Sequence, residues 1–146
     1  MIIKKGITGF GNVLSIKKDE INSILKTIKY PYTYSNIIEP QPNTNYFAID
    51  IQNKLTGTNF KLLINSIYTI IAGVTMESKW MELQFINLPE DFIEQIHNNE
   101  IIILNKEFLK QDMPEEELKL LDNNEIKQIQ HWNSKKYGEI LFNGYD

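Results

Sequence analysis

The chain has 146 residues, of which 42% are apolar, and its formal net charge is −4 at pH 7. This length predicts a single domain over residues 1–146, and the apolar fraction can build a core without metal or disulfide support. Cysteine is absent, which excludes disulfides, thiol catalysis and zinc–thiolate sites. All 15 basic residues are lysine, and this acidic, arginine-free composition argues against nucleic-acid binding.

The N-terminus does not resemble a signal peptide, because glycines interrupt the apolar residues that follow Lys4 and Lys5. The longest apolar runs, such as 101–104, are too short to span a membrane. We therefore expect a cytoplasmic protein with no membrane contact, although a secreted protein without cysteine is also compatible with the composition.

Glycine and helical periodicity organise the first thirty residues. Residues 1–16 predict one or two short strands around Gly6, Gly9 and Gly11. A helix is predicted over 16–29, where apolar residues recur at helical spacing until Pro31. The residues expected to face the core are Ile7, Phe10, Val13 and Leu14 in the first segment and Ile21, Ile24, Leu25 and Ile28 in the helix.

Residues 30–45 contain three prolines and predict a long irregular segment. Tyr30, Tyr32 and Tyr34 alternate along it. They could pack at the edge of the core, or they could form a recognition surface, because tyrosine is enriched at protein interfaces. Both interpretations remain open at this point.

A strand is predicted over 46–52, since apolar and polar residues alternate there, and further strands are predicted to follow over 59–65, 66–74 and 79–87. Gly57 is available for a hairpin turn, and a second turn is expected near 75–78. Short connections between successive strands favour an antiparallel meander.

The second half of the chain is predicted to be mainly helical. Pro89 opens a helix over 89–97, and a buried strand is expected at 100–104. Three further helices are expected over 114–121, 123–131 and 134–142, with Asp112 capping the first and Ser134 the last. The predicted fold class is therefore α+β: an antiparallel sheet of about four to six strands with N-terminal and C-terminal helices packed on it.

The chemical motifs point to binding rather than catalysis. His97 and His131 are 34 residues apart and match no metal-binding pattern, and no nucleophile motif is present. We expect no enzyme activity, no cofactor and no metal. The densest acidic cluster either stabilises the start of a helix or docks on a basic partner, and it contains Asp112, Glu115, Glu116 and Glu117.

The C-terminal segment carries an unusual set of large side chains for a chain end. It reads Trp132, then Gly138-Glu139-Ile140-Leu141-Phe142-Asn143, then Tyr145-Asp146. This segment, about 15 residues long, resembles the ending of small immunity proteins of contact-dependent growth inhibition and related polymorphic toxin systems of bacteria. Ser134 stands where those endings have proline.

The resemblance implies a non-enzymatic cytoplasmic protein that binds the C-terminal toxin domain encoded by its neighbouring gene. It implies a structural role for Trp132, Gly138, Phe142 and Asn143. We expect Tyr30, Tyr32, Tyr34 and the acidic cluster to contact the toxin, and a nuclease with a basic cleft would suit the negative charge. The alternatives are an interaction or assembly protein of a mobile element and a small hydrolase. The sequence leaves the oligomeric state open.

Overall fold

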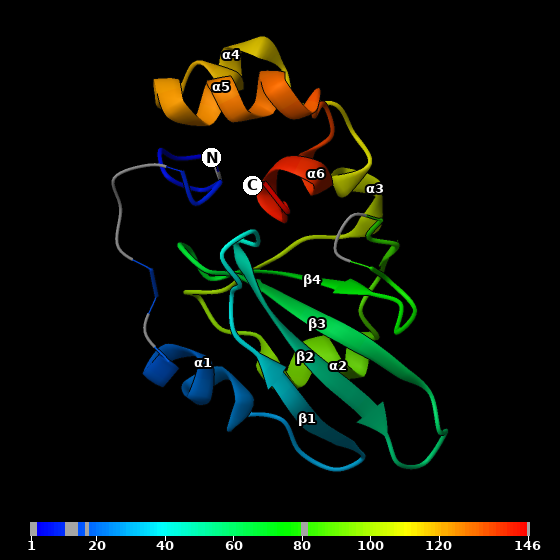
Figure 1. The fold of residues 1–146 in the computed structure, drawn as a ribbon. Helices are drawn as coiled ribbons and strands as arrows, with labels where there is room; N and C mark the ends of the chain where they lie inside the picture. The colour runs from blue at the N-terminus through cyan, green and yellow to red at the C-terminus, as the bar shows by residue number, and fades with distance from the viewer. Residues whose placement is uncertain (1–2, 11–14, 17, 80–81, 146) are drawn as a thin grey trace.

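A computed structural model describes residues 3–10, 15–16, 18–79 and 82–145 (Figure 1). Figure 1 shows the N-terminal loop and the last three helices gathered at one end of the sheet. The elements, in chain order, are α1 (Lys18–Leu25), β1 (Tyr32–Ile38), β2 (Tyr46–Asn53), β3 (Asn59–Asn65), β4 (Ile70–Val74), β5 (Phe85–Ile86), α2 (Glu90–Ile96), β6 (Ile102–Ile103), α3 (Lys106–Leu109), α4 (Glu115–Leu118), α5 (Asn123–Trp132) and α6 (Tyr137–Leu141).

The strands form one sheet in the order β1-β2-β3-β4-β5, with antiparallel neighbours, and β6 pairs in parallel with β4. The predicted α+β class and the antiparallel meander are confirmed. The strands predicted over 46–52 and 59–65 correspond to β2 and β3. Gly57 has the expected positive φ of 77° in the hairpin between them, because a turn of this kind needs a left-handed residue.

The prediction of an irregular segment over 30–45 was wrong in its first half. Residues 32–38 form β1, which pairs with β2 from Tyr32 opposite Asn53 to Ile38 opposite Ala48. Tyrosine, threonine and isoleucine favour a pleated, half-buried surface, and the prolines flank the strand rather than interrupt it. Asn36, with φ of 52°, lies in the β-bulge that shifts the register between Ser35 and Ile38.

Within residues 3–10 and 15–16, the described part of the segment 1–16, no strand forms, contrary to the prediction. Residues 5–9 form turns, and Gly6 and Gly9 have φ of 88° and 86°, which favours turning over extension. The predicted core positions Val13 and Leu14 lie outside the described residues. The helix predicted over 16–29 is shorter, because the bond from Thr27 N to Ile24 O tightens the chain after Leu25.

Each face of the sheet packs against a different group of helices. Phe47, Ile49 and Ile51 share one face and belong to the core covered by α1 and α2. Leu63 and Val74 face the opposite way and join the core formed with the C-terminal helices. The alternation of side chains along each strand therefore produces two cores, one on either side of a single sheet.

Two predicted helix caps were wrong, and the true cap lies elsewhere. Pro114, not Asp112, precedes α4, and it makes no side-chain cap bond. Asp112 instead forms an isolated β-bridge with Lys136. Lys136 also occupies the N-cap position of α6, so Ser134, two residues earlier, does not cap that helix. The capping box is at α5, where the Asp122 side chain accepts from Glu125 N at 3.0 Å.

Glu125 is fully buried and fastens the N-terminal loop to α5. Its carboxylate accepts hydrogen bonds from Gly6 N at 2.6 Å, Thr8 N at 3.0 Å and Thr8 Oγ1 at 2.5 Å. Asp122 N also donates to it, at 3.3 Å. A buried carboxylate needs such donors, because its desolvation is otherwise very unfavourable. Two segments more than a hundred residues apart are thus joined by one side chain.

Buried tyrosines predict a loss of stability at alkaline pH. Burial raises the pKa of Tyr46 and Tyr145 to about 12, and burial together with hydrogen bonds to Asp91 and Glu117 raises the pKa of Tyr32 and Tyr137 to about 12. The unfolded phenol has a pKa of about 10, so the folded state favours the neutral form. This stabilisation is complete below pH 10 and is lost as the pH rises towards 12.

We therefore expect the free energy of unfolding in urea to fall between pH 9 and pH 11.5. The Tyr46→Phe variant, which lacks one ionisable group, should lose less over the same interval than the wild-type chain. Equal pH dependence in the two proteins would contradict the assignment for Tyr46.

Candidate protein-binding surface

Exposed apolar side chains concentrate on β1 and the residue pair before it. Half of the large exposed apolar side chains of the described residues fall between residues 30 and 38. These four are Tyr30, Tyr34, Ile37 and Ile38, and we call them the β1 surface. The others are scattered singly at Leu55, Ile102, Leu120 and Trp132. Exposed apolar side chains gathered along one edge strand are more informative than single exposed residues, because exposed apolar surface on an edge often marks an interaction site.

The position of β1 in the sheet explains why these side chains are exposed. Among the strands of the described residues, β1 lies at the edge of the sheet and has only β2 as its neighbour. Before the bulge, Tyr34 lies opposite Ile51 and points to the side of the sheet that carries α1. After the bulge, Ile38 lies opposite Ala48, on the other side. The bulge therefore places exposed apolar side chains on both faces of the same edge.

A polar groove separates β1 from α1. It encloses about 290 Å³ and is lined by Asp19, Asn22, Ser23, Lys26 and Tyr34. The polar lining follows from the amphipathic pattern of α1, whose apolar residues face the core and leave its other side to the groove.

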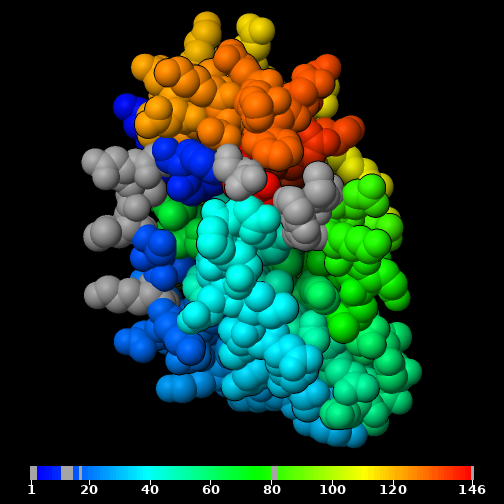
Figure 2. Space-filling model, in the orientation of Figure 1, coloured from blue at the N-terminus to red at the C-terminus, as the bar shows by residue number. Residues whose placement is uncertain are grey.

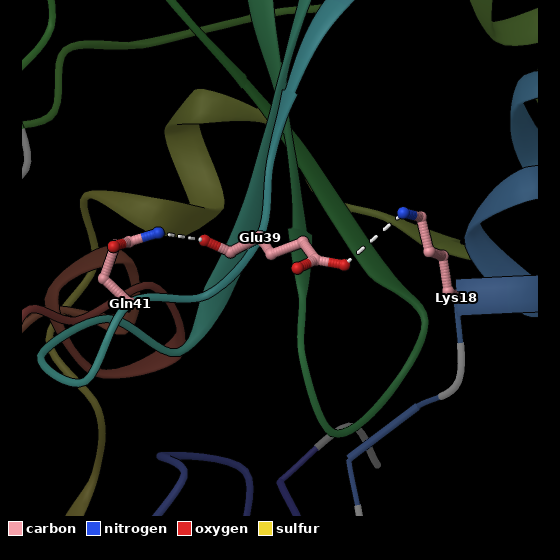
Figure 3. A network of polar contacts seen from close by, with 3 residues as sticks. All are labelled: Lys18, Glu39 and Gln41. Atoms are coloured by element: carbon pink, nitrogen blue, oxygen red, sulfur yellow. Dashed lines mark hydrogen bonds and ion pairs between the residues drawn. The ribbon is translucent and has the colours of Figure 1, made fainter.

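An ion pair joins the start of α1 to the residue that follows β1. Figure 3 shows Lys18 Nζ reaching towards Glu39 Oε1, 3.7 Å away, while Gln41 Nε2 donates to Glu39 O at 2.9 Å. Both charged side chains are mostly exposed, so the pair contributes little to stability. Its geometric consequence is a link between the first residue of α1 and the residue that follows β1.

A second hollow, of about 250 Å³, lies beside Ile38 on the other face of the sheet. Its apolar lining includes Ile38, Ala48 and Leu63, and it also holds one residue of each charge, Glu39 and Lys61. In Figure 2 the segment coloured cyan, around residue 40, covers the centre of the face in view. β1 thus has a hollow on each face: the groove beside Tyr34 on one and this hollow beside Ile38 on the other.

Of the three tyrosines predicted to contact a partner, the structure leaves two exposed. Tyr30 and Tyr34 are on the surface, but Tyr32 is only 3% exposed. Its ring packs edge-on against Phe92 at 5.0 Å between centroids, and its hydroxyl donates to Asp91 Oδ1 at 2.6 Å. Tyr32 is therefore not accessible to a partner in this structure, because the start of β1 lies over the core while its remainder extends beyond it.

The acidic cluster lies far from β1. Figure 1 shows α4 at the opposite end of the molecule from β1. Asp112, Glu115 and Glu116 are exposed there, whereas Glu117 is half-buried and accepts a hydrogen bond from the Tyr137 hydroxyl. The structure therefore does not bring the two predicted contact regions together, and it gives Glu117 a structural contact.

Three of the four motif residues at the C-terminus are buried. A Cβ on Gly138 would come within 2.5 Å of Phe85 Cε2, so the site accepts only glycine without a shift. Phe142 lies in the core, and Asn143 Nδ2 donates to Thr8 O and Ile140 O, both at 3.0 Å. Trp132 is partly exposed and stacks on Tyr145.

Two buried asparagines extend this network. The side-chain amides of Asn45 and Asn65 both donate to Ile7 O and Leu141 O. These bonds satisfy carbonyl groups of the N-terminal loop and of the last helix, which lie inside the protein. The C-terminal motif thus joins the N-terminal loop, the sheet and the last helix.

No group of three metal-binding side chains occurs within the described ranges, where His97 and His131 are both exposed. The helices in those ranges are all too short or too polar to cross a bilayer. Comparisons with protein-family models, with curated proteins and with solved structures find no match.

Sequence analysis missed Ile37, Ile38 and the groove residues of α1. Pro40 and Pro42 favour an irregular loop, but residues 32–38 before them are rich in types that favour strands. That composition could have revealed the strand. The groove could not have been found in this way, because it depends on how α1 and β1 pack.

Proposed function

We propose that this chain is a cytoplasmic immunity protein, which binds the toxin domain encoded by its neighbouring gene and blocks the active site of that toxin. The observation that carries the proposal is the apolar β1 surface on an edge strand. Exposed edges are usually protected by charge or proline, since they invite association. The resemblance of the C-terminal motif to immunity proteins supplies the class of partner.

Occlusion of an active site requires an interface of standard size, about 800 Å² on each protein. Within such an interface, a few well-packed aromatic and aliphatic side chains supply most of the affinity. Tyr34 and Ile38 are suited to this role because they stand 44% and 46% exposed on the two faces of one edge. The net charge of −4 suits a nuclease with a basic cleft, because opposite charge accelerates association.

The test is co-expression of this chain with the tagged C-terminal domain of the protein encoded upstream. We expect a stoichiometric complex and rescue of growth. The double variant Tyr34→Ser with Ile38→Ser should weaken binding by about 100-fold, since two buried contacts contribute more than 1 kcal/mol each and 1.4 kcal/mol is a factor of ten. Isothermal calorimetry on the purified, inactivated toxin domain measures the change.

Leu55→Ser is the matched control. Leu55 is 69% exposed in the hairpin between β2 and β3, so its replacement removes an apolar side chain outside the β1 surface. It should leave affinity and protection unchanged. A complex that tolerates the double variant as well as it tolerates Leu55→Ser would exclude the β1 surface, and failure of the wild-type chain to bind or protect would refute the immunity function.

A further inference from the structure

The backbone N–H and C=O groups of Tyr34 point towards the free edge of the sheet and not towards β2. Lys54 N donates to Pro31 O at 2.7 Å, which makes Tyr32 and Asn53 a non-hydrogen-bonded pair of the β1–β2 ladder. Antiparallel pairs alternate, so Thr33 and Gln52 exchange bonds and Tyr34, opposite Ile51, does not. The N–H and C=O of Tyr34 therefore face away from β2, at the free edge.

The chemistry of this edge admits another strand. Residues 32–38 carry no charge and no proline, which are the usual protections of an edge strand. The bulge at Asn36 limits the accessible edge to the few residues around Tyr34. Backbone hydrogen bonds to a partner could therefore form at only a few residues, and the specificity of binding must come from side chains in the groove.

The groove has opposite charges at its two ends. Asp19 lies in the first turn of α1 and Lys26 follows its last turn, so they are about 10 Å apart along the helix. Asn22 and Ser23 lie between them as neutral hydrogen-bonding groups. An extended segment could carry a cationic and an anionic side chain on one face, since same-side residues of a strand recur about every 7 Å, and these would lie near the oppositely charged ends of the groove.

We propose that the partner adds an extended segment to the edge of β1, bonded to the N–H and C=O of Tyr34 and lying in the groove beside α1. The segment places a cationic side chain near Asp19 and an anionic side chain near Lys26. Its opposite face contacts Ile38. Main-chain bonds supply affinity in this mode of recognition, and alternate side chains supply specificity. The identity of the partner as a toxin domain rests on the proposed function.

The test uses proline to remove one donor. Tyr34→Pro deletes an N–H that the β1–β2 ladder does not use, so the variant should fold, and its thermal midpoint checks this. Tyr34→Thr is the matched control, because it also loses the ring but keeps the N–H and favours a strand. We expect Tyr34→Pro to bind the tagged toxin domain about tenfold more weakly than Tyr34→Thr. In the wild-type complex, hydrogen exchange at the Tyr34 amide should slow by at least tenfold relative to the free chain.

The outcomes separate this inference from the proposed function. If the wild-type chain binds the toxin domain but the Pro and Thr variants bind equally and the Tyr34 amide stays unprotected, strand addition is overturned and the immunity function stands. If the wild-type chain does not bind, the proposed function fails and the toxin domain is overturned as the occupant. A dimer of this chain that protects the Tyr34 amide without toxin would assign the edge to a second copy and would also overturn the proposal.

Discussion

Replacement of Glu125 by alanine is expected to lower the free energy of unfolding by about 3–5 kcal/mol. The carboxylate is buried and accepts bonds from Gly6 N, Thr8 N and the Thr8 hydroxyl. Alanine would leave these donors without an acceptor inside the protein, and an unsatisfied buried donor is destabilising by about 1–3 kcal/mol. Urea unfolding followed by circular dichroism measures the effect.

Two further variants make the test specific. Lys127→Ala changes an exposed residue of the same helix and should alter stability by less than about 0.5 kcal/mol. Glu125→Gln keeps the volume and one acceptor oxygen, so it should fall between the wild type and Glu125→Ala. A stability of Glu125→Ala within the range of Lys127→Ala would show that the N-terminal loop does not depend on this carboxylate.

The second large effect is expected at Tyr32. Tyr32→Ala should lower the free energy of unfolding by about 3–5 kcal/mol, because it removes a buried ring and leaves a cavity. The ring lies against Phe60 and Phe92 in the core under α1 and α2. Tyr32→Phe, which loses only the bond to Asp91, should be destabilised by about 1 kcal/mol.

Tyr34→Ala is the natural control for Tyr32→Ala. It removes the same side chain two residues along the same strand, where the ring is exposed, and should change stability by about 0.5 kcal/mol or less. Thermal and urea unfolding of the two variants compare them directly. Equal destabilisation would contradict the burial of Tyr32. The result also decides the design of binding experiments, since a variant that includes Tyr32 would lose protection through unfolding.

The acidic cluster could stabilise the start of a helix or dock on a basic partner, and its residues differ in what they contact. Glu115 and Glu116 can be changed without loss of a described contact, whereas Glu117 accepts the bond from Tyr137. Since α4 and β1 lie at opposite ends of the molecule, a compact toxin domain centred on β1 would be influenced by α4 mainly through long-range charge. Such an influence acts on the rate of association and weakens with salt.

Local patterns in the sequence determined much of the sheet. Alternation along 46–52 indicates β2, and the apolar run over residues 62–64 indicates the part of β3 that is buried on both faces. Gly57 and Pro89 mark a hairpin and the start of a helix through their own backbone preferences. These features depend on residues close together in the chain.

Tertiary structure alone determined the burial and the hydrogen-bond partners of residues that have similar local sequence patterns. Tyr32 and Tyr34 have the same chemistry two residues apart, yet Tyr32 lies in the core under α1 and α2 and Tyr34 lies outside it. Glu125 reads as an ordinary acidic residue at the start of a helix, but its donors come from 117 and 119 residues away.

The same division applies to the candidate site. Composition predicted that tyrosines near residue 30 could contact a partner, but the exposed edge exists only because β1 pairs with β2 on one side. The groove exists only because α1 packs beside that edge. Burial, edge position and grooves depend on contacts between distant segments, whereas the sequence by itself determines the propensities of neighbouring residues, and those determined the α+β class and the strands at its centre.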